Sequence, residues 1–143
     1  ILFAGIGSYI SDRAAPRWPA LEWTMPIAAT AGLLVLLVLV PVVTRTTIGY
    51  GLAMRSAIVV ALLGPLSALL GFFFPTGLRL VNRLSPEATA WMWGVNGACS
   101  VLGSIVAVAI SIFVGIHANV LAAAALYGML AFPLAVLRRE SRA

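Results

Sequence analysis

The chain has 143 residues, of which 62% are apolar and 9% are charged, and its mean hydropathy is +1.09. A soluble domain carries about 25% charged residues, so this composition excludes an ordinary water-soluble fold. The nine arginines outnumber the four acids, but they are scattered singly and in pairs through short segments. This pattern is typical of charges that flank membrane spans and does not indicate a nucleic-acid-binding surface. The single cysteine, Cys99, excludes an internal disulfide, and we expect it to be a buried, structural thiol within a span.

Apolar runs predict an all-α fold: a polytopic transmembrane helix bundle with four full spans and a truncated first helix. The intervals Glu22–Arg45 and Arg55–Arg79 each exceed the about 20 residues that cross a hydrocarbon core, and Glu87–Arg138 is long enough for two crossings. Because no initiator methionine or signal peptide is visible, we expect residues 1–143 to be a single transmembrane domain and a fragment of a longer protein. The predicted spans are residues 1–10, 25–43, 56–74, 88–114 and 120–137.

Turn-forming residues predict how these spans bend and connect. Two prolines break any helix in the loop of residues 11–24. In the third span, Gly64–Pro65 predicts a kink, because proline removes one backbone hydrogen bond. Residues 75–90 are predicted to be a polar connector, part of which has helical spacing and predicts a short helix in the membrane interface. Residues 115–119 are predicted to be a tight turn.

The arginines orient the predicted bundle. On alternate sides of the spans, Arg45 and Arg55 are alone on one side, whereas seven arginines lie on the other: Arg13, Arg17, Arg79, Arg83, Arg138, Arg139 and Arg142. Because segments rich in arginine remain in the cytoplasm, the side with seven arginines predicts the cytoplasmic face, and the C-terminus is expected there.

The fourth span carries a face of small and polar residues. Asn96, Ser100 and Ser104 follow one another at i, i+4 spacing and therefore share one face of a helix. Gly97 and Gly103 give small-residue spacing that lets helix backbones approach closely. One interpretation is a packing seam in which Gly97 and Gly103 face the third and fifth spans. The alternative is a polar path or ligand site, because Asn96 lies toward the cytoplasmic half of the membrane.

A second motif closes the third span, where the sequence reads Phe74-Pro75-Thr76-Gly77-Leu78-Arg79. In one interpretation the helix ends at Pro75 and Gly77, and Arg79 reaches the lipid headgroups. In the alternative, a docking surface for a cytoplasmic domain is formed by Phe74, Pro75, Gly77 and Arg79.

The sequence offers no pattern of catalytic, metal-binding or cofactor-binding residues. It has no Ser/His/Asp set, metal cluster or phosphate loop, and the lone His117 has no cysteine or carboxylate nearby to complete a metal site. The Gly5-Ile6-Gly7 stretch lacks the preceding strand and third glycine of a dinucleotide-binding fingerprint. We therefore expect no catalytic, cofactor-binding or metal-binding residue in this fragment, and no nucleic-acid partner.

The segment Phe74–Arg79, paired with Trp91–Ser104, resembles the membrane part of bacterial spermidine synthase-like membrane proteins, which fuse MFS-like transmembrane helices to a Rossmann-type aminopropyltransferase domain. The opening segment Gly5–Arg13 also resembles a helix-to-loop junction in that family. The likeness is firmest over residues 71–115. The family's nucleoside-binding glycines and catalytic aspartates belong to the soluble domain, and no position of this chain matches them.

This resemblance implies a non-catalytic domain of the bacterial inner membrane that anchors a cytoplasmic aminopropyltransferase-like domain outside these residues. Its other expected partners are the lipid bilayer and the remaining transmembrane helices of the same protein. The rival hypothesis is part of an MFS-like transporter for a polyamine or other small solute. Gly64–Pro65 and Asn96 suggest it, because broken helices and polar groups at mid-membrane are typical of carriers. A polycation would, however, need carboxylates within the membrane, and the predicted spans contain none.

Overall fold

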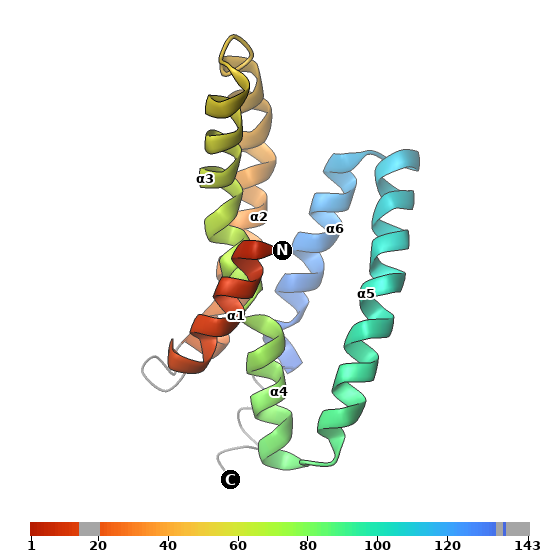
Figure 1. The fold of residues 1–143 in the computed structure, drawn as a ribbon. Coiled ribbons are helices and arrows are strands. Elements are labelled where there is room, and N and C mark those ends of the chain that lie inside the picture. The colour runs from red at the N-terminus through yellow and green to blue at the C-terminus, as the bar shows by residue number, and fades with distance from the viewer. Residues whose placement is uncertain (15–20, 134–135, 137–143) are drawn as a thin grey trace.

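The computed structural model describes residues 1–14, 21–133 and 136, and these residues form helices joined by short turns (Figure 1). No strand occurs among them, so the prediction of an all-α fold is confirmed. The helices in chain order are α1 (Leu2–Ala14), α2 (Leu21–Thr46), α3 (Leu52–Leu70), α4 (Phe73–Leu84), α5 (Ala88–Phe113) and α6 (Ile116–Met129).

Four helical segments are long and apolar enough to cross a membrane: Thr24–Thr46, Leu52–Leu84, Ala88–Phe113 and Ile116–Pro133. They account for the four predicted full spans, and α1 is the shorter first helix. Large apolar side chains are exposed on all of them, which suits lipid because an α-helix satisfies its own backbone groups. The predicted end of the last span, at residues 134–135 and 137, lies outside the described residues.

The helix connections gather at two opposite ends of the bundle. The α2–α3 and α5–α6 connections lie at one end, and the α4–α5 connection lies at the other, toward which α1 also runs (Figure 1). Arg45 and Arg55 belong to the first end, in α2 and α3. Arg79 and Arg83 in α4, and Arg13 in the last turn of α1, belong to the second, here named the arginine-rich end. The other arginines predicted on that side lie outside the described residues: Arg17, Arg138, Arg139 and Arg142.

The third span is interrupted at Gly71–Phe72 and then continues as α4. Pro75 has no N–H to donate to the carbonyl four residues earlier, which belongs to Gly71. The chain tightens there: the Gly71 N–H donates to the carbonyls of Ser67 and Ala68, both at 3.1 Å, and the α-helical pattern resumes with the Thr76 N–H on the Phe72 carbonyl at 3.1 Å.

One prediction about this span is therefore wrong in position. The helix does not terminate at Pro75 and Gly77, because α4 contains both residues. Helix α3 includes Pro65, and the kink at Gly64–Pro65 stays a prediction. The first part of the predicted connector, through Leu84, instead extends the span along the direction of α3 (Figure 1).

The turn between α5 and α6 is shorter than the five residues predicted. Gly115 has φ of +110°, a conformation that glycine adopts without strain, and its N–H donates to the Ile110 carbonyl at 3.0 Å. Helix α6 begins at the next residue, so His117 and Asn119 lie in its first turn. The Asn119 amide donates to Ser111 Oγ at 3.1 Å and ties the two helices together.

Helices α1 and α3 pack backbone against backbone at two glycines. A Cβ atom on Gly7 would overlap the carbonyl of Ala68, and one on Gly71 would overlap the carbonyl of Ala4. Gly64 is buried beneath the ring of Phe3, which lies 3.1 Å from the position of a Cβ atom. Small residues allow this close approach between membrane helices. The hydrophobic effect does not drive two helices together within lipid, so van der Waals contacts stabilise their association.

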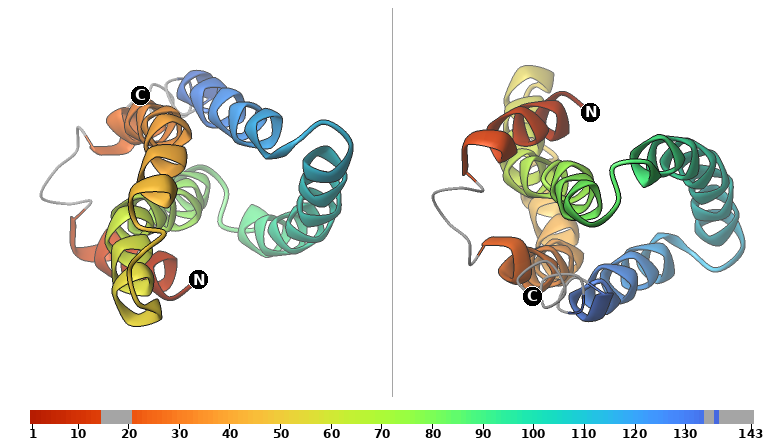
Figure 2. Two further views of the ribbon diagram at one scale, coloured as in Figure 1. Left: turned by 90° about the horizontal axis from the view of Figure 1, so that it is seen from above. Right: turned by 90° about the horizontal axis from the view of Figure 1, so that it is seen from below.

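Helix α2 packs against α6 through small side chains in the same way. Ala29 and Ala124 are buried, and Thr30 Oγ1 donates to the Ala124 carbonyl at 3.2 Å. Seen along the helices, α5 stands apart from α2 and α3 and meets the rest of the bundle through α4 and α6 (Figure 2).

The glycine packing predicts a large difference between two substitutions one helical half-turn apart. Gly7→Ala should destabilise the fold by about 1–3 kcal/mol, because the added methyl group forces α1 away from the α3 backbone. Gly5→Ala is the matched control, since a Cβ atom there meets nothing within 4 Å. Unfolding of both variants by sodium dodecyl sulfate in mixed micelles would test this, and equal stabilities would contradict the observed packing.

Candidate functional site

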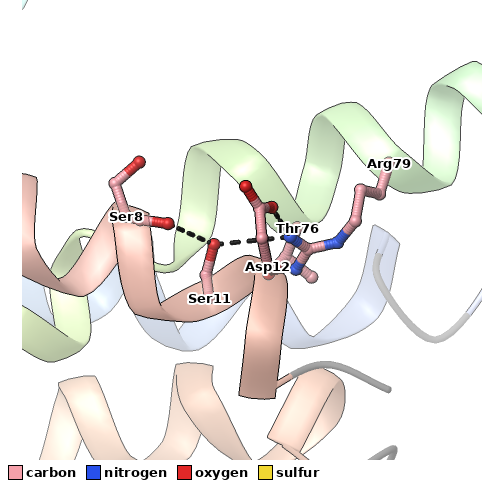
Figure 3. A network of polar contacts seen from close by, with 5 residues as sticks. All are labelled: Ser8, Ser11, Asp12, Thr76 and Arg79. Carbon is pink, nitrogen blue, oxygen red and sulfur yellow. Dashed lines mark hydrogen bonds and ion pairs between the residues drawn. The ribbon is translucent and has the colours of Figure 1, made fainter.

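The most prominent polar cluster among the described residues joins α1 to α4 near the arginine-rich end (Figure 3). The Arg79 guanidinium pairs with the Asp12 carboxylate, with 2.7 Å between Nη1 and Oδ1. Nη1 also donates to Ser11 Oγ at 3.3 Å, and Nη2 donates to Thr76 Oγ1 at 2.9 Å. The Ser11 hydroxyl donates in turn to the Ser8 carbonyl at 2.7 Å. We name these five residues the Arg79 network.

Helical spacing places the members of the Arg79 network together. Thr76 and Arg79 are three residues apart on α4. On α1, Ser11 and Asp12 follow Ser8 by three and four residues, so each set lies on one side of its helix. Ser11 and Thr76 are buried, at 0% and 2% exposure, and buried hydroxyls need hydrogen-bond partners. Arg79 donates a hydrogen bond to each of these two hydroxyls. The Asp12 side chain is 74% exposed, so the ion pair opens toward solvent and is worth less than a fully desolvated one.

A polar cavity of about 360 Å³ lies beside the Arg79 network, between α1, α4 and α5. Two further polar side chains, Asn82 and Thr89, line this cavity. Thr89 Oγ1 donates a hydrogen bond to Asn82 Oδ1 at 3.1 Å. Its aromatic wall is formed by Phe74 and Trp93, whose rings meet edge to face with centroids 4.8 Å apart. Charged, amide and aromatic groups in one cavity suit the binding of a polar group rather than a bond-breaking reaction.

A larger, mostly apolar cavity of about 500 Å³ lies between α4, α5 and α6, and we name it the three-helix cavity. One wall is closed by the rings of Phe73 and Tyr127, whose centroids are 4.9 Å apart. Asn96 and Cys99 line it from α5, together with Gly77 from α4. Phe74 lines both cavities, so its ring stands between the polar space and the apolar one.

The small-residue face of α5 is open rather than packed. Cβ atoms on Gly97 and Gly103 would meet nothing within 4 Å, so the prediction that these glycines face the third and fifth spans is wrong for the described residues. The shared face itself is real, because Ser100 Oγ donates to the Asn96 carbonyl and Ser104 Oγ to the Ser100 carbonyl, both at 2.7 Å. Ser100, Ser104, Gly97 and Gly103 lie outside both cavities, and only Asn96 of this set enters one. Cys99 is exposed, contrary to the expected burial.

The candidate docking residues lie between helices instead of at a free end. Phe74 and Pro75 line the polar cavity, Gly77 lines the three-helix cavity, and Arg79 is held by Asp12 rather than extended to headgroups. All four are only partly exposed. An exposed stretch at this end runs from the last turn of α4 into its connection with α5, at positions 82–87. A docking role for the motif therefore remains a prediction.

Sequence reasoning missed Asp12 as the partner of Arg79, and it missed Tyr127 in the three-helix cavity. An acid and an arginine at the same ends of two parallel spans were the available signal for the first. For Tyr127 the sequence held no such signal, since a lone tyrosine in an alanine-rich helix has many possible neighbours.

Among the described residues no group of three potential metal ligands is present. Comparison of the chain with protein-family models, with curated proteins and with solved structures found no match.

The ion pair should show energetic coupling in a double-mutant cycle. We expect Asp12→Ala and Arg79→Ala to have a coupling energy of about 0.5–1 kcal/mol, the upper part of the range for partly exposed pairs. The exposed Arg83 provides the control, and a cycle of Asp12→Ala with Arg83→Ala should give no coupling. Detergent unfolding of the single and double variants supplies the measurement. Independent, additive effects of the Asp12 and Arg79 substitutions would show that the ion pair does not form.

The open face of α5 predicts that Gly103→Leu is tolerated. A Cβ atom at Gly103 meets nothing within 4 Å, so we expect the melting temperature in detergent to stay within about 2 °C, since surface changes usually lie within about 0.5 kcal/mol. Gly71→Leu is the contrasting variant, because it adds the same group against the Ala4 backbone. A strong loss of stability in Gly103→Leu would mean that another helix covers this face.

Proposed function

We propose that this chain is the membrane domain of a spermidine synthase-like protein of the bacterial inner membrane, and that it anchors and positions a cytoplasmic aminopropyltransferase-like domain. The Arg79 network is the observation that carries the proposal. It fastens α4 to α1 near the arginine-rich end, and the exposed residues 82–87 begin in the last turn of α4. A domain resting at this end would meet helices whose relative positions are fixed.

The attachment surface in this proposal is the exposed last turn of α4 together with its connection to α5. It contains Arg83 and Glu87, a basic and an acidic side chain that no described residue engages in an ion pair. Phe74, Pro75, Gly77 and Arg79 act behind this surface, by holding α4 against α1 and α5. The orientation follows from the arginine count: the arginine-rich end, and with it the C-terminus, faces the cytoplasm.

The second candidate function is part of an MFS-like transporter, and two observations favour it. The third span is interrupted at Gly71–Phe72, and the three-helix cavity brings the polar Asn96 into the membrane-spanning part of the bundle. Interrupted helices and polar groups at this depth are features of carriers. The residues that line this cavity include no carboxylate, which argues against a polyamine as its cargo and leaves neutral solutes.

The orientation is tested by labelling single cysteines in a Cys99→Ser background. We expect a membrane-impermeant maleimide added to intact spheroplasts to modify His117→Cys, because His117 is exposed at the end opposite to the arginine-rich end. Ser85→Cys, in the α4–α5 connection, should react only after the membrane is permeabilised. The reverse pattern would overturn both the orientation and the cytoplasmic docking.

The anchoring function is tested on the full-length protein in inside-out membrane vesicles. Protease should release a soluble domain from the exposed side and leave the helices in the membrane, and the released domain should be assayed for aminopropyl transfer. If protease releases no folded domain from either side of the membrane, the anchor proposal fails. Solute flux in proteoliposomes that is lost in Asn96→Leu but kept in Ser100→Ala would then favour the transporter.

A further inference from the structure

The three-helix cavity combines an apolar wall with two polar groups that have no hydrogen-bond partner among the described residues. Its wall is largely aromatic and aliphatic, with Phe73 and Tyr127 in ring contact on one side. No described residue forms a hydrogen bond with the Asn96 amide or the Tyr127 hydroxyl, although both line the cavity. Within a bilayer no water is at hand to satisfy such groups, so a bound molecule that reaches them gains an interaction that lipid chains do not offer.

The charge of the cavity restricts what it can hold. None of the described residues that line it is Asp, Glu, Lys or Arg, so an ion transferred there would lose its hydration without gaining a charged partner from them. The charged Arg79 network lies beyond Phe74, in the neighbouring polar cavity. Phosphate, carboxylate and ammonium groups are therefore poor occupants of the three-helix cavity, whereas an uncharged hydroxyl or carbonyl meets its polar groups.

The depth of the polar groups points to a ligand from the bilayer. Helix α5 has 26 residues and a length of about 39 Å, close to the thickness of a bilayer with its headgroups. Asn96 lies about 12 Å along the axis from the start of α5, which places it below the headgroup layer. A cavity volume of about 500 Å³ is within the ordinary range for small-molecule sites.

We propose that the three-helix cavity binds a neutral amphiphile: an apolar chain or ring against the aromatic wall, and one uncharged hydrogen-bonding group at Asn96 and Tyr127. This site is separate from the docking surface at residues 82–87. Cys99 is the only cysteine of the chain and lines the cavity from α5, as Asn96 does. Its reactivity can therefore report whether the cavity is occupied.

The test uses the full-length protein in phosphatidylcholine nanodiscs with a dodecanol that carries a diazirine on its chain. After irradiation, we expect labelled peptides from α4 and α5, including the peptide with Cys99, and competition by unlabelled 1-dodecanol that saturates. Dodecylamine and dodecyl phosphate, at the same concentration, should compete at least tenfold less well. The rate at which N-ethylmaleimide alkylates Cys99 should also fall when 1-dodecanol is added.

Two variants address the site from different sides. Asn96→Leu should raise the half-competing concentration of 1-dodecanol about tenfold, the effect of losing one hydrogen bond. Gly77→Leu should abolish labelling, because a Cβ atom at Gly77 meets nothing within 4 Å and the side chain can occupy the cavity. The controls are Ser100→Ala and Ala98→Leu on exposed parts of α5, which should label as the unsubstituted protein does.

Three outcomes would overturn the proposal. Labelling that does not saturate, or that Asn96→Leu and Gly77→Leu both leave unchanged, would mean that the probe merely dissolves in the bilayer. Equal competition by the charged amphiphiles would remove the requirement for a neutral group. Absence of labelling in α4 and α5 would mean that another part of the protein fills the cavity. If Gly77→Leu fails to fold, the comparison of Asn96→Leu with Ser100→Ala still tests whether the probe binds in this cavity.

Discussion

The close contact between the backbones of α1 and α3 sets the position of the polar network at the arginine-rich end. Gly7 and Gly71 leave room for the carbonyls of Ala68 and Ala4, so the two helices approach at a distance that any side chain would prevent. This contact carries the end of α1 to α4, where Asp12 reaches Arg79. Arg79 then satisfies the hydroxyls of Ser11 and Thr76, which the same packing has buried. A polar network near the membrane surface thus depends on two glycines deeper in the bundle.

The bilayer explains why so little of this chain is buried against itself. In water, exposed leucines and valines along α2 and α5 would drive further packing, but lipid tails are as apolar as those side chains. Helices then associate where geometry permits close contact, as small residues permit between α1 and α3 and between α2 and α6. The small-residue face of α5 shows that suitable residues are not sufficient, because Gly97 and Gly103 have no described neighbour to approach.

The sequence predicted the fold class and the number of spans, because hydropathy over 20 residues is a strong and local signal. It predicted the shared face of Asn96, Ser100 and Ser104 for the same reason, since helical periodicity is local. It expected the third span to end at Pro75 and Gly77, whereas the chain is interrupted earlier and then continues as α4. A proline disturbs the preceding turn, so the effect of Pro75 falls on Gly71–Phe72. Which helices meet is a long-range property. Gly7 and Gly71 have ordinary sequence surroundings, and only the folded chain shows that they, rather than Gly97 and Gly103, form the close contact.

The position of Phe74 connects the two candidate functions. Its ring packs against Trp93 and separates the polar cavity beside Arg79 from the three-helix cavity, which Asn96 lines. A scaffold needs this ring to stay in place, because it helps to hold α4 against α5. A carrier would need it to move, since the charged groups of the Arg79 network lie on its far side. A polycation entering from the arginine-rich end would first meet an Asp12 carboxylate that Arg79 already neutralises. The described lining of the next cavity has no carboxylate, so neither step offers the polycation an unpaired negative charge. Neutral molecules need no such charge, and the same cavity can receive them from the lipid while Phe74 stays in place, which makes ligand binding compatible with a rigid membrane anchor.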